Sequence, residues 1–339
     1  MKGNGLDTSE KKGFWVKLII GLVVVYMLIT IGLGIYWSDQ PEIWNVKRVV
    51  EQDAAALGKQ PQVGFATTST LIRLTETLLQ KPGGYLSNDV APPGIWMDNM
   101  ANWEFGMLVQ LRDLSRALRK DIARSQSTSR EDTDLATAEP QLHFDNRSFW
   151  FPSTENEYKR GIRYLKAYQA RLLDDDQSNA QFYARADNLR NWLADVETRL
   201  GSLSQKLSAS VGREQLNVDL AGDNAARQST TSPQELRLKT PYLQIDDVFY
   251  EARGASFALV HLMKAIEIDF QNILEKKNAM VSVQQIVREL EATQEPVMSP
   301  MILNGSGFGV FANHSLVMAN YISRANAAII DLRRLLEQG

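Results

Sequence analysis

Side chains that could bind a ligand are concentrated where two long predicted helices begin. The sequence GSGFG at residues 305–309 carries glycines that let the backbone approach a bound group closely. Hydroxyl, ring, amide and imidazole side chains accompany them: Ser306, Phe308, Asn313 and His314. Because the free N–H groups of a helix point out of its first turn, an anionic or polyhydroxyl group could bind there.

The other helix opening combines aromatic rings, amides and carboxylates. These residues are Trp96, Asp98, Asn99, Asn102, Trp103 and Glu104. Such a mixture suits stacking on a sugar ring with hydrogen bonds to its hydroxyl groups. A structural interpretation competes with binding at both openings: Asn313 caps a helix, His314 is an ordinary first-turn residue, and the two tryptophans belong to the core. We favour the structural interpretation at each opening and keep the ligand site as the alternative.

No catalytic signature is found in the sequence. The three histidines, His143, His261 and His314, have no spacing typical of a zinc site. The chain contains no cysteine, which excludes disulfides, thiolate catalysis and cysteine metal sites. Nucleophile-elbow, phosphate-loop and HExxH motifs are absent, and no strand precedes GSGFG as it would in a dinucleotide-binding fold. We therefore predict no catalytic residue, no metal and no cofactor.

Paired carboxylates offer the strongest argument for an enzyme. Glu104 with Asp113, or Asp246 and Asp247 with Glu251, could in principle cleave a glycosidic bond. Acidic pairs are also common on solvated helix faces, so we expect these to be ordinary surface residues. The net charge of −3 and the isoelectric point near 5.8 leave no basic field for a nucleic-acid backbone, and we expect no nucleic-acid partner.

An uncharged stretch, Leu18 to Trp37, determines where the rest of the chain lies. It is long enough to cross a bilayer as a helix, and the aromatic residues at both ends are typical of membrane–water interfaces. A cleaved signal peptide would end in small residues, whereas Tyr36 and Trp37 are bulky. We predict a cytoplasmic tail over residues 1–13 and an uncleaved transmembrane signal anchor over residues 14–37, held in membrane lipid.

Charges on either side of the stretch predict its orientation. Asp39 and Glu42 are the first charged residues after it. Lysines lie before it: Lys2, Lys11, Lys12 and Lys17. Because positive flanks stay in the cytoplasm, we expect a cytoplasmic N-terminus and an exported body.

The body is predicted to be all-α. Period-two patterns are scarce, and apolar residues recur at helical spacing between polar, glycine-rich and proline-rich breaks. We predict a first helical unit (38–125), a polar spacer (126–152), a coiled-coil helical hairpin (153–208), a polar linker (209–240) and a second helical unit (241–339). The spacer is rich in Ser, Thr, Asp and Glu and is expected to be a solvated loop, and Thr67 and Thr68 are expected to cap a helix.

The hairpin is predicted from a seam of apolar residues. Between Phe182 and Leu207 these residues alternate spacings of four and three, the pattern of a coiled coil. The facing stripe would come from Ile162 to Leu172 in the preceding helix, in an antiparallel hairpin. A homodimeric coiled coil is the alternative, because such a seam can equally take an intermolecular partner.

The second helical unit echoes the first. MANW at residues 100–103 matches MANY at residues 318–321, and DLSRAL at 113–118 matches DLRRLL at 331–336 in the same register. The echo indicates an internal duplication, with chance similarity between periodic helices as the alternative.

Two long segments resemble a known family. PPGIWMDNMANWEFGMLVQLRDLSRAL and MILNGSGFGVFANHSLVMANYISRANAAIIDLRRLL, behind a single N-terminal span, are similar to a proteobacterial family of single-pass inner-membrane proteins catalogued only as a domain of unknown function. The resemblance covers nearly the whole chain. It implies a Gram-negative inner membrane, and it transfers no activity, cofactor or site residue.

Together these features predict a membrane-anchored, helical, periplasmic protein of the cell envelope. The leading hypothesis is a scaffold or protein-interaction module without catalytic activity, with an envelope protein as its partner and a homodimer as a further option. The alternative is an envelope ligand binder or glycan-acting enzyme that uses the loops opening the two long helices.

Overall fold

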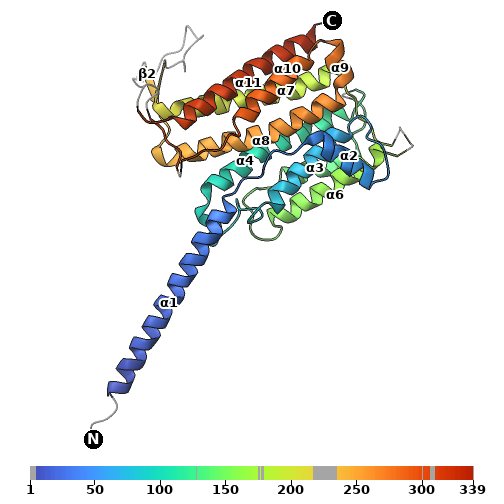
Figure 1. Cartoon of the computed structure of the whole chain (residues 1–339). Coiled ribbons are helices and arrows are strands. Elements are labelled where there is room, and N and C mark those ends of the chain that lie inside the picture. The colour runs from blue at the N-terminus through green and yellow to red at the C-terminus, as the bar shows by residue number, and fades with distance from the viewer. Residues whose placement is uncertain are drawn as a thin grey trace, which may run out of the picture.

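The computed structural model describes residues 5–126, 128–174, 176, 179–216, 235–299, 301–305 and 310–338. It shows a helical body from which one long helix, α1 (Gly5–Trp37), projects (Figure 1). The C-terminus lies at the end of the body away from α1. The expected all-α class with an N-terminal apolar helix is confirmed.

The body contains helices of very different lengths. In the described residues they are α2 (Val46–Ala56), α3 (Phe65–Gln80), α4 (Asp98–Ala117), α5 (Thr133–Leu142), α6 (Thr154–Leu172), α7 (Ala186–Ser208), α8 (Ile245–Asp269), α9 (Gln271–Lys276), α10 (Met280–Ala292) and α11 (His314–Glu337). Shorter turns are η1 (Gly94–Trp96), η2 (Leu118–Ile122), η3 (Ala209–Val211) and η4 (Tyr242–Gln244). Within the expected linker, β1 (Arg213–Leu216) and β2 (Glu235–Leu238) form an antiparallel pair.

Helix α8 lies at the centre of the body. Its middle is buried on every side, because alanine, leucine, valine and phenylalanine residues follow one another there with few polar interruptions. Helices α4, α3 and α10 pack against it, and α4 makes the most extensive contact (Figure 1). Because these helices all pack against α8, it determines where the ends of its neighbours lie.

Helices α4 and α8 cross so closely that backbone meets backbone. A Cβ atom added to Gly106 on α4 would overlap the carbonyl oxygen of Glu251 on α8. One added to Gly254 on α8 would overlap the carbonyl oxygen of Trp103 on α4. Each helix therefore supplies one glycine to the crossing, and the close approach brings the N-terminal parts of both helices together.

The predicted hairpin does not form. Helix α7 packs along α11, whereas α6 packs along α5 and α3. The seam on α7 is buried as expected, with Leu189, Leu193 and Leu200 fully covered. Its partner lies far along the sequence, so choosing the nearest helix was wrong. Because the seam is covered within the chain, it offers no surface for a homodimeric coiled coil.

Residues 126–152 are not a solvated spacer, because they contain α5. This helix buries an apolar face, and its acidic residues pair with arginines instead of facing water. Arg119 of η2, which follows α4, lies 2.6 Å from the carboxylate of Glu139. Arg171 of α6 lies 2.8 Å from the carboxylate of Asp132, just before α5. The acidic residues that led to the prediction of a loop therefore attach α5 to its neighbours through ion pairs.

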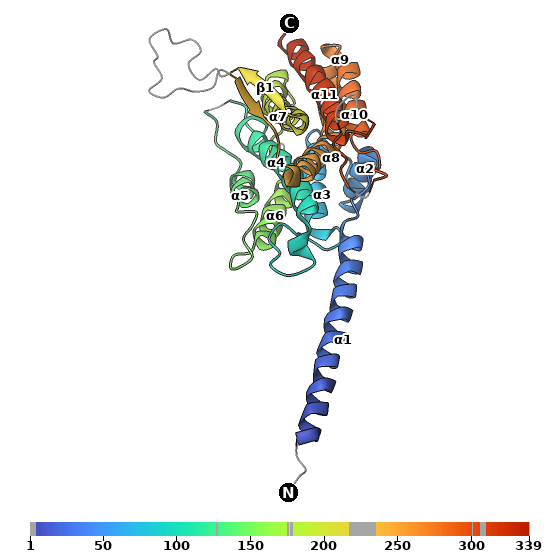
Figure 2. The ribbon, with the colours of Figure 1, turned by 90° about the vertical axis from the view of Figure 1, so that its left-hand side faces the viewer.

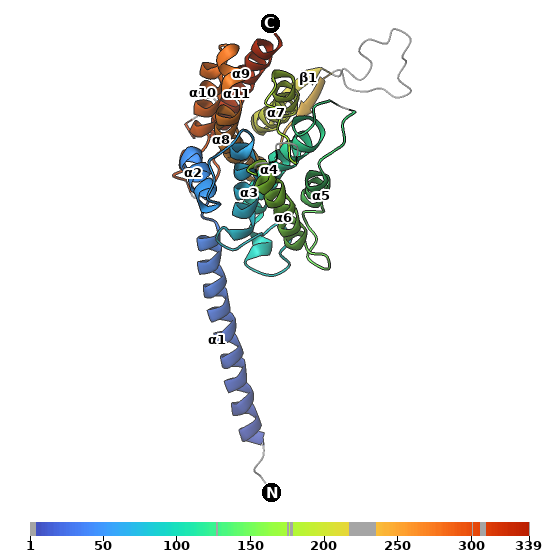
Figure 3. The same ribbon diagram turned by 90° about the vertical axis from the view of Figure 1, so that its right-hand side faces the viewer.

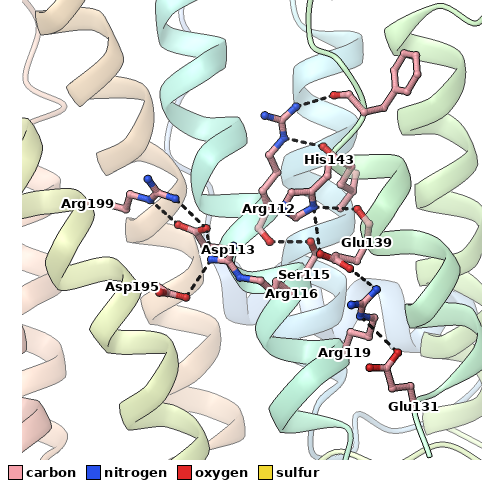
Figure 4. Close-up of polar contacts among 12 residues, drawn as sticks. Arg112, Asp113, Ser115, Arg116, Arg119, Glu131, Glu139, His143, Asp195 and Arg199 are labelled. Carbon is pink, nitrogen blue, oxygen red and sulfur yellow. Dashed lines mark hydrogen bonds and ion pairs between the residues drawn. The ribbon is translucent and has the colours of Figure 1, made fainter.

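Helix α4 joins two layers through polar residues on two different sides of the helix (Figure 4). On one face, Arg112 donates hydrogen bonds to the carbonyl oxygens of Leu142 and Phe144, at 2.8 and 2.7 Å, where α5 ends. On the other face, Asp113 accepts a hydrogen bond from Arg199 of α7 at 2.8 Å. Asp113, one of the carboxylates considered for glycan cleavage, is therefore used to join two helices.

The start of α3 also differs from the prediction. Gly64 precedes the helix in the left-handed conformation, and Thr67 and Thr68 are buried within the first turn instead of capping it. The N–H groups of Gly64 and Thr67 donate to the carboxylate of Asp269, at the end of α8, at 2.9 and 2.6 Å. Burial raises the pKa of Asp269 to about 6. A distant carboxylate thus does the work of the predicted threonine cap.

The two echoed segments pack differently. Helices α10 and α11 lie closely against each other, whereas α3 and α4 make few direct contacts and are joined through α8. The matched Leu114 and Leu332 are both buried, but the matched Asp113 is buried and Asp331 is exposed. The internal duplication stays a prediction.

Candidate functional site

The openings of α4 and α11 lie on either side of the start of α8. On one side, Asn102 of α4 donates a hydrogen bond to Asp247 of α8 at 2.8 Å. On the other, the ring of His314, the first residue of α11, lies with its centroid 6.5 Å from that of Phe249 of α8. The two predicted openings therefore flank one end of α8, but they form separate surfaces.

The first surface is a cleft of about 660 Å³ at the opening of α4. Its walls come from the loop before α4, the first turns of α4 and α8, and the loop between α5 and α6. Its charged lining residues are Asp89, Asp98, Arg147, Asp247 and Glu251. With four carboxylates and one guanidinium, the cleft suits a cationic or hydroxyl-rich ligand.

Two carboxylic acids in this cleft, Asp247 and Asp89, have raised pKa values. Burial raises the pKa of Asp247, and the carboxylates of Asp98 and Asp246 raise it further, while the hydrogen bond from Asn102 acts in the opposite sense. Burial, followed by the carboxylate of Glu155, likewise raises the pKa of the neighbouring Asp89. Raised carboxylate pKa values in a cleft are a feature of binding and catalytic sites.

The predicted residues at the opening of α4 have different environments. Trp96, in η1, is more than half exposed beside the cleft, Asn99 is half-buried, and Asn102 is bonded to Asp247. Trp103 is fully buried, and its ring centroid lies 5.2 Å from that of Phe257. The ligand-binding hypothesis is therefore wrong for Trp103, and the core interpretation is wrong for Trp96.

Glu104 supports the cleft from beneath. Its buried carboxylate lies 2.6 Å from the ammonium of Lys81, which is also fully buried. The same carboxylate accepts hydrogen bonds from the backbone N–H groups of Leu86 and Ser87, each at 2.9 Å. Burial raises the pKa of Glu104 above its ordinary value. This cluster holds the loop between α3 and α4, which forms one wall of the cleft.

The opening of α11 confirms the structural interpretation for Asn313. Its side chain accepts a hydrogen bond from the N–H of Leu316 at 2.9 Å and caps the helix. His314 accepts one through Nδ1 from the N–H of Leu303 at 3.0 Å, which ties the preceding loop to the helix. Both side chains therefore have partners inside the chain.

Large apolar side chains surround this second opening, and the sequence analysis did not select them. We call the apolar surface the set Tyr242, Leu243, Val310 and Phe311, each more than two-thirds exposed. Tyr242 and Gly305 line a pocket of about 520 Å³, and Phe311 lies against Gly305. The predicted Ser306 and Phe308 belong to the same loop but lie outside the described residues. In the sequence these residues form two apolar pairs, Tyr242–Leu243 and Val310–Phe311, within otherwise polar or glycine-rich segments. That pattern could have identified them.

The buried His261 has a structural role. Its Nε2 accepts a hydrogen bond from the N–H of Trp44 at 3.2 Å, and its Nδ1 donates one to the carbonyl oxygen of Phe257 at 2.7 Å. Burial lowers the pKa of His261 to about 3, so the ring is neutral at physiological pH. In the part of the chain that the structure describes, no three His, Asp or Glu side chains are arranged to hold a metal ion.

Fold and site define an all-α protein with one N-terminal helix, Lys12–Trp37, of membrane-spanning length and composition. The chain belongs to the bacterial family described as "Uncharacterized protein conserved in bacteria (DUF2333)", which matches residues 8–339. The resemblance to a family known only as a domain of unknown function is thereby confirmed. Neither the curated proteins nor the solved structures contain a match to this chain.

Proposed function

We propose that this protein is a membrane-anchored protein-interaction module of the bacterial cell envelope. In this proposal α1 crosses the inner membrane with its N-terminus in the cytoplasm and carries the body in the periplasm, where the body binds an envelope protein without catalysis. Anchoring is supported by the length, hydropathy and almost complete exposure of residues 12–37. The lysines before the uncharged stretch Leu18 to Trp37 support the orientation.

The apolar surface is the observation that carries the proposal. Contiguous exposed apolar groups on a folded protein mark interaction sites, and aromatic residues are enriched at the centres of protein interfaces. Tyr242 lines the pocket at Gly305, Phe311 lies next to Gly305, and this pocket could receive one side chain of a partner.

Several groups that could support catalysis are committed to internal contacts. Glu104 is buried against Lys81, and Asp113 is bonded to Arg199. His261 is buried and bonded to backbone groups on both ring nitrogens. These contacts explain the presence of chemically capable side chains without invoking a reaction.

Photo-crosslinking in native bacterial membranes tests the proposal. A photoreactive amino acid is placed at Tyr242 and, separately, at Phe311, with a matched probe at Val281, an exposed apolar residue on α10. We expect both surface probes to capture the same protein, and the Val281 probe to miss it. The Leu243→Ser variant should reduce the yield of that adduct severalfold while the body stays folded, since Leu243 is exposed.

A second candidate function, binding of a small cationic or hydroxyl-rich ligand, is favoured by the acidic cleft and by the raised pKa of Asp247. A photoreactive probe at Ile95, which lines this cleft, discriminates between the two functions. Glycan adducts at Ile95 that disappear in the Asp247→Asn variant, with no protein adduct at Tyr242 or Phe311, would replace the interaction module by a ligand binder.

A further inference from the structure

Three consecutive aromatic residues project from the loop between α5 and α6. Phe149, Trp150 and Phe151 are exposed, and the exposed fraction reaches 71% for Trp150 and 86% for Phe151. Their rings contact one another, with centroids 6.0 Å apart for the first pair and 5.7 Å for the second. Such a cluster leaves a large apolar area in water unless something else covers it.

The loop that carries these rings is rigidly built. The carbonyl oxygen of Ser148 accepts hydrogen bonds from the N–H of Thr154 at 3.0 Å and from the side chain of Asn88 at 2.9 Å. The hydroxyl of Ser148 donates to the carbonyl oxygen of Pro152 at 2.8 Å, which closes the neck of the loop. The rings therefore project as a fixed tip, and Asn88 connects this tip to the loop before α4.

The loop before α4 contacts the apolar helix α1. A Cβ atom added to Gly34 would lie 3.7 Å from Pro93, and the ring of Trp37 lies against Gly83. Immediately after Pro93, the turn η1 exposes Ile95 and Trp96. Two exposed apolar side chains thus lie next to a contact with the candidate span itself.

Shielding along α1 shows how far this contact extends. Within residues 12–37, every residue is exposed except Thr30, Gly34 and Trp37. These three follow at spacings of four and three, so they share one face of the helix. From Thr30 to Trp37 the helix rises about 10 Å, so the shielded face covers the last two turns of the apolar stretch.

The views of the whole chain agree with this arrangement. In Figures 2 and 3, the loop between α5 and α6 and the loop before α4 lie at the edge of the body from which α1 departs. Helix α9 and the C-terminus lie at the opposite end. The exposed aromatic groups therefore face the side on which a membrane crossed by α1 would lie.

We propose that the body docks onto the bilayer that α1 crosses, inserting the aromatic tip (Phe149, Trp150 and Phe151) and the η1 pair (Ile95 and Trp96) at the headgroup level. The proposal rests on the anchoring of α1 proposed above. Tryptophan and phenylalanine are the side chains that favour this interfacial zone. With α1 as one attachment and the loops as two more, the body is held in one orientation against the lipid surface.

The cysteine-free chain allows a direct depth measurement. Single cysteines at Phe151 and at Ile95 are labelled with a nitroxide in the full chain, which is reconstituted in vesicles of phosphatidylethanolamine and phosphatidylglycerol. Spin relaxation by oxygen, which concentrates in lipid, is compared with relaxation by a water-soluble nickel chelate. The matched control is Val281→Cys, which is 76% exposed and lies on α10.

We expect the oxygen-to-nickel ratio at Phe151 and Ile95 to exceed that at Val281 severalfold. Equal ratios at all three positions would overturn the docking. A nitroxide at Val24, in the middle of α1, separates the two proposals. Water exposure at Val24 would refute the anchoring itself, whereas lipid exposure at Val24 with water exposure at Phe151 would refute only the docking.

Two further measurements complete the test. Serine at all three tip positions, Phe149, Trp150 and Phe151, should lower the oxygen-to-nickel ratio at Ile95, and an unchanged ratio would show that the tip does not hold the body down. Dipolar broadening of the Phe151 nitroxide that grows with protein density in the vesicle would assign the tip to a second copy of the chain and overturn the lipid proposal.

Discussion

At the scale of single residues, the buried ion pair of Lys81 with Glu104 organises the surroundings of the cleft. The ammonium also donates to the carbonyl oxygen of Gly84 at 2.5 Å, and the carboxylate holds two backbone N–H groups of the same loop. Two charges buried this completely are tolerable only while both are present and hydrogen-bonded. The loop that carries Asn88 and Pro93 therefore depends on a pair that never reaches solvent.

Replacing Glu104 by Gln should lower the free energy of unfolding by about 3–5 kcal/mol, because it leaves the ammonium of Lys81 buried without a counter-charge. The measurement is urea denaturation of the full chain in detergent micelles. The partly exposed pair of Lys264 with Glu291 is the matched control, and Glu291→Gln should cost only about 0–1 kcal/mol. Similar losses for both variants would contradict the role given to burial.

The neutral His261 predicts how stability depends on pH. In the unfolded chain this ring takes up a proton near pH 6.5, but in the folded body only near pH 3. Between these values the unfolded state binds more protons, so the free energy of unfolding should fall as the pH is lowered from 6.5 towards 3, by up to ~1.4 kcal/mol per pH unit. His261→Gln should remove this slope, and an unchanged difference between wild type and variant across that range would contradict it.

Asp269 acts on stability in the opposite direction. Its folded pKa of about 6 exceeds its ordinary value of 3.8, so between these values the folded state binds more protons. This group alone makes the protein more stable as the pH falls from 6 to 3.8. The contributions of His261 and Asp269 to the pH dependence therefore have opposite signs. Because Asp269 is present in both proteins, the difference between the wild type and His261→Gln reports the histidine alone.

Sequence reasoning succeeded at residues whose partners are local and failed where partners are distant. Asn313 caps the helix that follows it directly, and the cap was predictable from its position. Thr67 does not cap α3 as predicted. The carboxylate of Asp269 accepts the hydrogen bond from the N–H of Thr67, and only the tertiary fold brings Asp269 to the start of α3. Trp96 and Trp103 occur in the same short segment, yet Trp96, in the turn η1, is exposed, whereas Trp103, on α4, is buried against Phe257 of α8.

At the scale of elements, helices α4 and α8 cross with backbone against backbone. Gly106 and Gly254 each face a carbonyl oxygen of the other helix, so no rotamer change can relieve an added methyl group. The same crossing positions Asn102 beside Asp247 at the cleft.

Gly106→Ala should reduce stability by about 1–3 kcal/mol or more, since the helices must move apart, and thermal unfolding monitored by circular dichroism measures the loss. Gly201→Ala is the matched control in α7. Its added Cβ would lie 3.6 Å from the Asn326 side chain, an ordinary contact, so the helix-favouring alanine should leave stability unchanged or raise it by up to about 1 kcal/mol. A greater loss at Gly201 than at Gly106 would refute this account of the crossing.

Helix positions were predictable from apolar periodicity, but helix pairing was not. The seam on α7 is visible in the sequence, while its partner α11 follows only after the whole of α8 and α10. Helix α5 was missed because Asp132 and Glu139 were interpreted as solvated residues, although each has an arginine partner on another helix. The composition of a segment shows which charges it carries, but it does not show whether oppositely charged residues elsewhere in the chain pair with them.

At the scale of the whole molecule, the orientation of α1 decides in which compartment the apolar surface and the cleft lie. A reporter enzyme that is active only in the periplasm, fused after Gly339, should be active in cells, because the lysines before the uncharged stretch Leu18 to Trp37 hold the N-terminus in the cytoplasm. A cytoplasm-only reporter at the same position is the control and should stay inactive. The reverse pattern would place the body in the cytoplasm.

The shielded face of α1 limits how the body can rotate about the axis of that helix. Because Gly34 and Trp37 both meet the loop before α4, the body has a fixed bearing about the axis of α1 and is not free to swivel on it. The opposite face of α1 is exposed throughout residues 12–37. A second transmembrane helix could pack only against that exposed face of α1. The cleft, the aromatic tip and the apolar surface would then always have the same orientation relative to that helix.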